Sequence, residues 1–221
     1  MTPETWTAVD RYITDRLLPP DTALDGAVQA STDAGLPAIA VSPAQGKFLH
    51  LLAKLIHARR VLEIGTLGGY STIWLAKALS PGGRLITLEF DAKHATIARA
   101  NLAMAGLSGV VDVRVGRAID ALPTLANDEP FDLIFIDADK PSTPDYFEWA
   151  IKLSHPGSVI IVDNLVRGGR LIDEKGDEDI QGMRQFMDRL ATDTRVNATA
   201  LQTVGVKGYD GFAIAVVEGG R

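Results

Sequence analysis

The chain has 221 residues, of which 46% are hydrophobic, and carries a formal net charge of −6. This is enough for one sizeable domain with a full core, and the acidic charge argues against a nucleic-acid-binding protein. Cysteine is absent, which excludes disulfides, thiolate metal sites and cysteine nucleophiles and fits a reducing cytoplasm. No apolar run approaches the roughly 18 residues that span a bilayer, and the polar N-terminus is unlike a signal peptide. We therefore expect a cytoplasmic protein without a membrane segment.

The predicted elements begin with three helices and continue with an alternation of strands and helices. Apolar spacing predicts the first helices over 3–18, 22–34 and 43–57, the last with Ser42 as N-cap and Pro43 in first position. Further helices are expected over 71–79, 92–105, 118–125, 144–153 and 180–191. Strands are expected over 60–65, 84–90, 111–116, 131–137, 158–164, 199–204 and 212–217. The last two strands, linked by 205–211, should form an antiparallel hairpin.

This order predicts a single α/β domain over residues 1–221. Residues 1–58 supply extra N-terminal helices, and residues 59–221 form a Rossmann-like core. Five strand–helix units followed by a hairpin imply a doubly wound, mostly parallel, seven-stranded sheet with helices on both faces. The strands at 131–136 and 158–162 are apolar almost throughout, as expected for strands that are covered on both sides.

A glycine-rich turn, VLEIGTLGGYS (61–71), joins the first predicted strand to its helix. Its glycines allow a sharp turn and let a ligand approach the main chain closely. The spacing G-x-x-G-G matches neither the dinucleotide fingerprint nor a P-loop. Glu89, about 20 residues further on, is placed to accept hydrogen bonds from both hydroxyls of a ribose. The turn therefore indicates a nucleoside site, the alternative being a turn that only packs a helix tightly on a strand.

Oxygen-bearing side chains end two strands that should be parallel neighbours. Asp137 ends the fourth strand, and Asp163 and Asn164 end the fifth. In a doubly wound sheet these strand ends line the same crevice as the glycine turn. Three oxygen ligands, two of them charged, suit a hard divalent cation such as Mg²⁺ or Mn²⁺. The alternative is that both aspartates only cap the helices that follow.

Lys140 lies three residues after Asp137, beyond the predicted strand. A metal cation and partial burial would both disfavour its ammonium form. It could then accept a proton from a hydroxyl that the metal makes more acidic. The alternative is a surface lysine paired with Asp139 or Asp145. Asp139 itself is interpreted as a solvent-facing or loop-orienting residue and not as a metal ligand.

Two other functions fit parts of this pattern. The D-A-D at 137–139 matches the D-x-D of a metal-dependent glycosyltransferase, although the glycine turn and Glu89 fit that function poorly. A catalytically inactive binding module would keep the nucleoside site, but it would not need a lysine beside three oxygen ligands. The acidic run at 173–179 is interpreted as a solvated loop or, alternatively, as a mobile flap over the site.

Several segments together resemble the cation-dependent class I O-methyltransferases, a family that includes catechol O-methyltransferase and the caffeoyl-coenzyme A O-methyltransferases. These segments are VLEIGTLGGYSTIWLAKAL, LITLEFD, VRVGRAIDALPTL, FDLIFIDADK and VIIVDN. The similarity runs from about residue 36 to the end of the chain. Two positions depart from the family pattern: Gly68 stands where many relatives have threonine, and Arg117 where bacterial relatives often have an acidic residue.

The resemblance implies S-adenosylmethionine as methyl donor and Mg²⁺, Mn²⁺ or another divalent cation as metal. By motif position, the donor-binding residues would be Val41, Glu63, Gly65, Thr66, Ser71, Glu89, Ala118 and Asp137. The metal ligands would be Asp137, Asp163 and Asn164, and the catalytic residues Lys140, as base, and Asp137.

The reaction implied by the resemblance is methylation of one hydroxyl of a vicinal aromatic diol, either catechol-like or caffeoyl-like. Acceptor choice should depend on residues 166–180, the final hairpin and the N-terminal helices, with Asp210 as a candidate substrate-binding acid. Because relatives are commonly homodimers, the apolar N-terminal helices are expected to supply a dimer interface.

Overall fold

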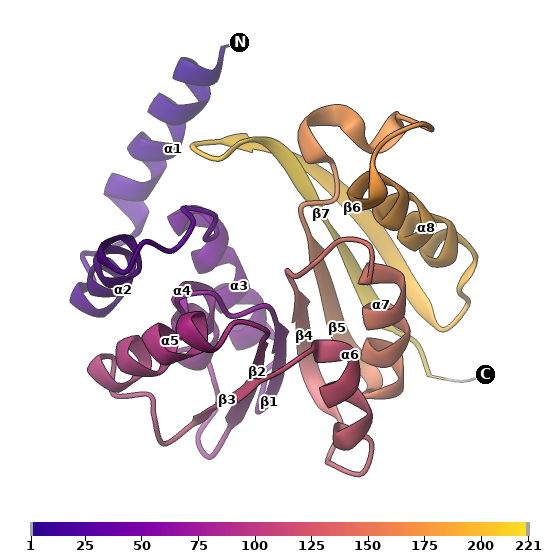
Figure 1. Ribbon diagram of the computed structural model, residues 1–221, viewed down its shortest axis with the longest axis horizontal. Helices are drawn as coiled ribbons and strands as arrows, with labels where there is room; N and C mark the ends of the chain where they lie inside the picture. The colour runs from indigo at the N-terminus through magenta and orange to yellow at the C-terminus, as the bar shows by residue number, and fades with distance from the viewer. Residues whose placement is uncertain (1, 220–221) are drawn as a thin grey trace.

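The computed structural model describes residues 2–219, and within them a seven-stranded sheet runs through the molecule (Figure 1). The strand order is β3-β2-β1-β4-β5-β7-β6. The strands are β1 (Arg60–Ile64), β2 (Arg84–Glu89), β3 (Val111–Val115), β4 (Phe131–Ile136), β5 (Ser154–Asp163), β6 (Val196–Gly205) and β7 (Gly208–Val217). Strands β1 to β5 are parallel to one another, whereas β7 runs antiparallel to both β5 and β6. The predicted doubly wound, Rossmann-like sheet with an antiparallel hairpin is confirmed.

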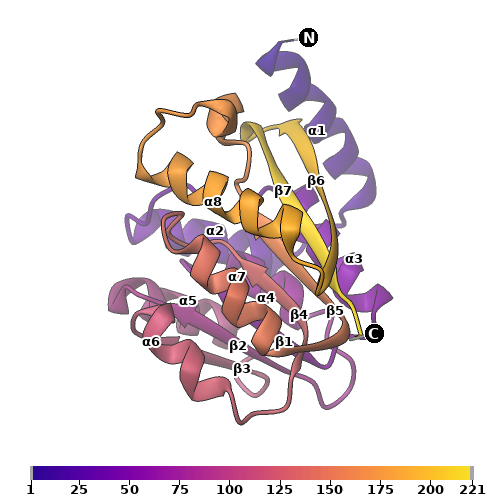
Figure 2. The same cartoon turned by 90° about the vertical axis from the view of Figure 1, so that its right-hand side faces the viewer.

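Helices cover both faces of this sheet (Figure 2). The α-helices are α1 (Pro3–Leu17), α2 (Thr22–Asp33), α3 (Pro43–Leu55), α4 (Tyr70–Ala76), α5 (Ala92–Met104), α6 (Ala118–Ala121), α7 (Thr143–Lys152) and α8 (Glu178–Thr192). Short 3₁₀ helices are η1 (Leu122–Leu125) and η2 (Arg167–Ile172). Helices α3, α4 and α5 pack on one face, and η1, α7 and α8 on the other. Within residues 2–219, no helix combines the length and the apolar character needed to cross a membrane.

Alternating side chains of the central strands supply two separate hydrophobic cores. On β4, Leu133 and Phe135 face the layer of α3, α4 and α5, while Ile134 and Ile136 face the layer of α7 and α8. All four are at most 1% exposed. Because both faces of β4 are covered, the strand can be apolar at nearly every position, and its first polar side chain at the carboxyl end is Asp137.

The largest differences from the predicted boundaries are at the start of β5 and in the β6–β7 hairpin, where β6 begins at Val196 and not at residue 199. Strand β5 begins at Ser154, which pairs with Phe131, and not at residue 158. The His155-Pro156-Gly157 turn lies inside the strand as a bulge, where the register with β4 shifts. In the hairpin, Gly205 pairs with Gly208, so only residues 206–207 form the turn instead of 205–211. The glycines that looked like a loop by composition are paired strand residues here.

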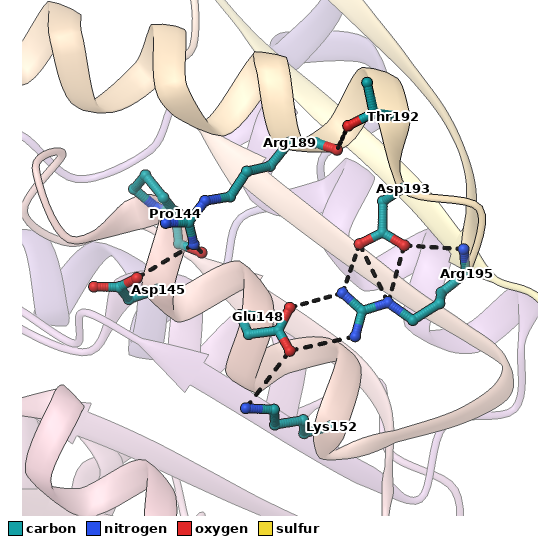
Figure 3. A network of polar contacts seen from close by, with 8 residues as sticks. All are labelled: Pro144, Asp145, Glu148, Lys152, Arg189, Thr192, Asp193 and Arg195. Carbon is teal, nitrogen blue, oxygen red and sulfur yellow. Dashed lines mark hydrogen bonds and ion pairs between the residues drawn. The ribbon is translucent and has the colours of Figure 1, made fainter.

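A network of polar contacts ties α7 to the connection between α8 and β6 (Figure 3). The Arg195 guanidinium donates to both carboxylate oxygens of Glu148, at 3.3 and 2.7 Å, and contacts Asp193 at 2.6 Å. Lys152 also lies 3.5 Å from Glu148. These arginine contacts lower the pKa of the Glu148 carboxyl and that of Asp193. The network therefore holds the layer of α7 and α8 to the edge of the sheet.

Arg195→Ala is expected to lower the free energy of unfolding by only about 1 kcal/mol, because the side chain is half exposed and water screens the pairs. Both carboxyl pKa values are lowered in the folded state, so this stabilisation is present at neutral pH and is lost as the pH falls through those values. Urea denaturation at pH 7 and pH 3 measures it. A loss that is equally large at pH 3 would contradict this account.

Candidate active site

A cavity of about 1320 Å³ lies at the carboxyl ends of the central strands. The strand order reverses direction between β1 and β4: from β1 the chain continues to β2 and β3 on one side, and β4 and β5 lie on the other. Ligands bind at this point in doubly wound sheets. The cavity extends from the turn after β1 to the loop at 36–42 and the tip of the β6–β7 hairpin. Its volume exceeds that of a typical pocket for one small molecule, so it can hold two ligands side by side.

The glycine turn forms the floor of this cavity, as expected. Gly65 has φ of 101°, and a Cβ there would lie 2.0 Å from the Asp137 carbonyl oxygen. Only glycine lets the ends of β1 and β4 approach this closely. Thr66, Ser71 and Gly65 itself line the cavity. The turn therefore joins the predicted nucleoside site and the predicted metal site in one space.

Glu89 lies across the glycine turn at the end of β2 and lines the cavity. Its Oε2 accepts hydrogen bonds from the backbone N–H groups of Thr66, at 3.1 Å, and Leu67, at 2.7 Å. Its Oε1 accepts one from the Asp91 N–H at 2.9 Å, and His94 Nδ1 lies 3.4 Å away. The carboxylate thus holds the turn in shape and remains accessible to a ribose through its free lone pairs.

The carboxylates that end β4 and β5 come together because these strands are parallel neighbours in register, with Ile136 beside Val162. Asp137, Asp163 and Asn164 all line the cavity. Asp163 is 3% exposed, and burial, followed by repulsion from Asp137, raises the pKa of its carboxyl well above its ordinary value. The arrangement concentrates negative charge where water is scarce.

This donor set fits a hard divalent cation. Two carboxylates and one amide offer oxygen ligands, and the remaining positions of an octahedral ion would face the open cavity. A dication would also relieve the repulsion between Asp137 and the buried Asp163. Within residues 2–219, no group of three histidine, cysteine, aspartate or glutamate side chains is suited to a metal. The third ligand is therefore expected from the amide of Asn164.

Lys140 is buried between these carboxylates and is only 6% exposed. Its Nζ lies 3.1 Å from Asp137 Oδ1 and donates to the backbone carbonyl of Asp163 at 3.3 Å. Helix α8 fixes its main chain, since a Cβ on Gly182 would lie 2.3 Å from the Lys140 carbonyl oxygen. The alternative of a surface lysine paired with Asp139 or Asp145 is wrong.

Comparison with known proteins agrees with this geometry. The O-methyltransferase family model matches residues 21–214. The chain belongs to the O-methyltransferase family. Catechol O-methyltransferase of Niastella koreensis is 54% identical over 214 residues, covering 96% of this chain and 97% of its own length.

Two solved structures are similar over the whole fold. An O-methyltransferase from Bacillus cereus in complex with SAH has a TM-score of 0.97 and 58% identity, covering 98% of this chain and 100% of that one. TomG from Streptomyces achromogenes, an O-methyltransferase involved in tomaymycin synthesis and solved in complex with SAM, has a TM-score of 0.96 and 52% identity, covering 99% and 100%. Family membership excludes the glycosyltransferase function considered for residues 137–139.

Among the remaining donor-binding residues predicted for this O-methyltransferase, two line the cavity and one does not. Val41 and Ala118 both line the cavity. Glu63, expected to line the same cleft, is fully buried and absent from the cavity wall. It lies behind the turn and accepts hydrogen bonds from Ser71 Oγ and Thr87 Oγ1, each at 2.6 Å, and from Thr72 Oγ1. Of these three hydroxyl donors, only Ser71 lines the cavity.

The buried position of Glu63 gives the methyltransferase a measurable pH dependence. Burial raises the pKa of Glu63 from 4.5 to about 7. Between these values the folded state keeps a proton that the unfolded state releases, so the free energy of unfolding falls as the pH rises from 4.5 to 7. The full effect is at most about 3 kcal/mol. In Glu63→Gln this contribution is missing, so the variant should gain stability relative to wild type from pH 5 to pH 8 in urea denaturation. If the free energy of unfolding depends on pH in the same way in both proteins, the raised pKa of Glu63 is refuted.

Two cavity residues, Gln45 and Tyr146, were missed from sequence. Gln45, in the first turn of α3, donates from Nε2 to Asp163 Oδ2 at 2.7 Å. Tyr146 donates to Asp139 Oδ1 at 2.6 Å, and both residues line the cavity. Burial and then this carboxylate raise the pKa of the Tyr146 hydroxyl, so it remains a donor at neutral pH. Tyr146 lies only seven residues after Asp139, so the sequence could have indicated this pair. The Gln45 contact joins residues 118 positions apart, and no sequence spacing indicates it.

Asp210, considered as a substrate-binding acid, makes three hydrogen bonds to the backbone of its own surroundings. Its Oδ1 accepts hydrogen bonds from the N–H groups of Val166, Arg167 and Gly211, each at 2.9 Å. The residue lies at the edge of the cavity, but its carboxylate shapes the loop after β5. The polar stretch that follows is partly ordered as η2.

Proposed function

We propose that this protein transfers the methyl group of S-adenosylmethionine to one hydroxyl of a vicinal aromatic diol in a reaction that requires a divalent cation. The observation that carries this proposal is the buried Lys140 side chain, whose Nζ lies 3.1 Å from Asp137 Oδ1 and 3.3 Å from the Asp163 carbonyl oxygen, in the cavity that Glu89 also lines. One space would thus bring together an acid for the nucleoside, a pair of carboxylates for the cation and a base for the acceptor hydroxyl.

The donor would lie over the glycine turn. Glu89 would accept hydrogen bonds from the ribose hydroxyls, and the cavity residues Ala118 and Tyr146 would border adenine. Gly65, Thr66, Ser71, Val41 and Asp137 would surround the methionine end. The relatives in complex with SAM and SAH support this placement.

The acceptor would lie between the carboxylates and the hairpin. Phe48 and Phe212 line this part of the cavity with ring centroids 5.1 Å apart and offer apolar faces to an aromatic ring. Asp137, Asp163 and Asn164 would hold Mg²⁺ or Mn²⁺, which would orient two adjacent hydroxyls and make them more acidic. The relative named catechol O-methyltransferase supports a catechol-type acceptor.

Lys140, as the neutral amine, would take the proton of one acceptor hydroxyl at Nζ and become an ammonium. The oxygen then attacks the methyl carbon in line with the sulfur, and the carbon–sulfur bond breaks as the carbon–oxygen bond forms. The positive charge on sulfur and the negative charge on oxygen disappear together. Protein groups therefore need to align the reactants more than to stabilise a new charge.

Thermal shift with S-adenosylhomocysteine, with and without Mg²⁺, followed by methyl transfer to a catechol panel, tests this function. We expect stabilisation by the nucleoside and Mg²⁺-dependent methylation of at least one catechol. Stabilisation without methylation of any catechol would instead favour the inactive binding module. Absence of both responses would contradict the proposal.

The exposed apolar side of α1 supports a homodimer. None of the side chains of α1 is buried in the protomer, and Val9, Tyr12 and Leu17 are each more than half exposed. The neighbouring edge strand β6 has no charged side chain, and residues 197–204 are exposed. We expect a dimer by light scattering and a monomer for Leu17→Glu, whereas a wild-type monomer at micromolar concentration would exclude this interface.

A further inference from the structure

Arg167 lies on the wall of the acceptor part of the cavity, three residues beyond Asn164. It begins η2, which follows the end of β5. Its side chain is 31% exposed and shares the cavity wall with Asp179 from the first turn of α8. The proposed reaction leaves this cationic group without a role.

The backbone at Arg167 is held in a conformation that non-glycine residues rarely adopt. Its φ is 54°, and Asn164 has φ of 56°. Asp210 Oδ1 holds this loop by accepting the N–H groups of Val166 and Arg167, each at 2.9 Å. Strained residues that the surroundings enforce cluster at binding sites. The loop therefore places both the Asn164 amide and the Arg167 guanidinium on the same cavity wall at a conformational cost.

The guanidinium has donors to spare. One terminal nitrogen donates to Asp179 Oδ2 at 2.6 Å. In the part of the chain that the structure describes, this is the only hydrogen bond that the Arg167 side chain makes. A guanidinium has five N–H donors in a planar fork that matches a carboxylate. The N–H groups that do not contact Asp179 can therefore donate to a second, incoming carboxylate.

We propose that Arg167 binds a carboxylate carried by the methyl acceptor, so that the protein favours catechols with an acidic side chain over neutral ones. This inference rests on the proposed function, because it takes the diol to lie at Asp137, Asp163 and Asn164. A substituent on the ring then extends along the same continuous cavity toward Arg167. One guanidinium that is already shared with Asp179 suits a single negative charge and not a polyanion such as coenzyme A.

The chain contains its own control for a purely structural role. Arg170, in the same 3₁₀ helix, donates to Asp177 Oδ2 at 2.8 Å, as Arg167 does to Asp179. Both arginines thus brace η2 on the start of α8. Arg170 does not line the cavity. If bracing is all that Arg167 does, the two arginines should be equivalent in every assay of acceptor choice.

The test compares 3,4-dihydroxyphenylacetate with 4-ethylcatechol, which has a side chain of similar size without the charge. For Arg167→Met, kcat/KM for the acid should fall about ten- to a hundredfold, and kcat/KM for the neutral catechol by less than about threefold. Arg170→Met should keep the wild-type ratio. Asp179→Asn should raise the preference for the acid, because a competing carboxylate is removed.

Equilibrium binding of both compounds to the wild type and Arg167→Met, with S-adenosylhomocysteine and Mg²⁺ present, supplies a readout without turnover. An Arg167-dependent preference for the acid in binding supports the inference even if neither compound is methylated, in which case the proposed function fails instead. An equal loss for both compounds, the same loss in Arg170→Met, or no preference in binding would overturn the role of Arg167 and leave the methyltransferase function intact.

Discussion

Asp163→Asn is expected to lower kcat for methyl transfer by at least about a thousandfold, because a cation that contributes several kcal/mol to the reaction loses a charged ligand. Asparagine keeps the size of the side chain and can still accept the hydrogen bond that Asn164 N–H donates to Asp163 Oδ1 at 2.8 Å. Donor binding should survive, since Glu89 and the glycine turn lie on other strands. A titration with Mn²⁺, followed by electron paramagnetic resonance, measures the affinity for the cation. Calorimetry measures the affinity for S-adenosylhomocysteine.

The same variant has a second expected effect on stability. Burial beside Asp137 raises the pKa of Asp163, which means that its charge is costly in the folded protein. In metal-free buffer, Asp163→Asn should therefore melt at the same temperature as the wild type or higher. The control is Asp128→Ala, which removes an exposed carboxylate just before β4 begins, at the end of the strand away from the site. It should change neither activity nor cation affinity. Wild-type Mn²⁺ affinity in Asp163→Asn would contradict the metal assignment.

Lys140→Met is expected to lower kcat about a hundred- to ten-thousandfold, the usual contribution of a positioned general base. Methionine fills much of the buried volume that the lysine occupies, so the fold should be retained. Because the ammonium lies 3.1 Å from Asp137, its removal should leave Mn²⁺ affinity unchanged or increase it. Single-turnover methylation separates the chemical step from product release.

The direction of the Mn²⁺ change distinguishes two roles for Lys140. Loss of a base lowers kcat without lowering the affinity for the cation. Loss of a lysine that only organises the carboxylates would lower kcat and the cation affinity together. Lower Mn²⁺ affinity in Lys140→Met, in parallel with the loss of rate, would therefore contradict its role as base. Arg189→Met, at an arginine that contacts Asp145 on the outside of α7, should retain full rate and serves as the control.

Those features of the site that depend on regular structure could be predicted from sequence. Asp137 and Asp163 follow apolar strands, and neighbouring parallel strands bring their carboxyl ends together. The position of Glu89 opposite the glycine turn follows from the same rule for β1 and β2. These predictions needed only the order of the strands and the period of the side chains.

Features that depend on packing between distant segments could not be predicted in this way. The hydrogen bond from Gln45 to Asp163 requires the first turn of α3 to lie beside the carboxyl end of β5. No local sequence pattern predicts this packing. Glu63 faces away from the cavity because the hydroxyls of Thr72 and Thr87 donate to its carboxylate behind the turn. Arg167 appeared to belong to a polar loop, since composition does not reveal that Asp210 orders its backbone.

The dependence of methyl transfer on a divalent cation tests the central claim most directly. Transfer of a labelled methyl group from S-adenosylmethionine to a catechol should stop in excess chelator and return when Mg²⁺ is added beyond the chelator. Donor binding, measured in the same buffers, should persist throughout. Full turnover in excess chelator would contradict the assignment of Asp137, Asp163 and Asn164 as the cation site.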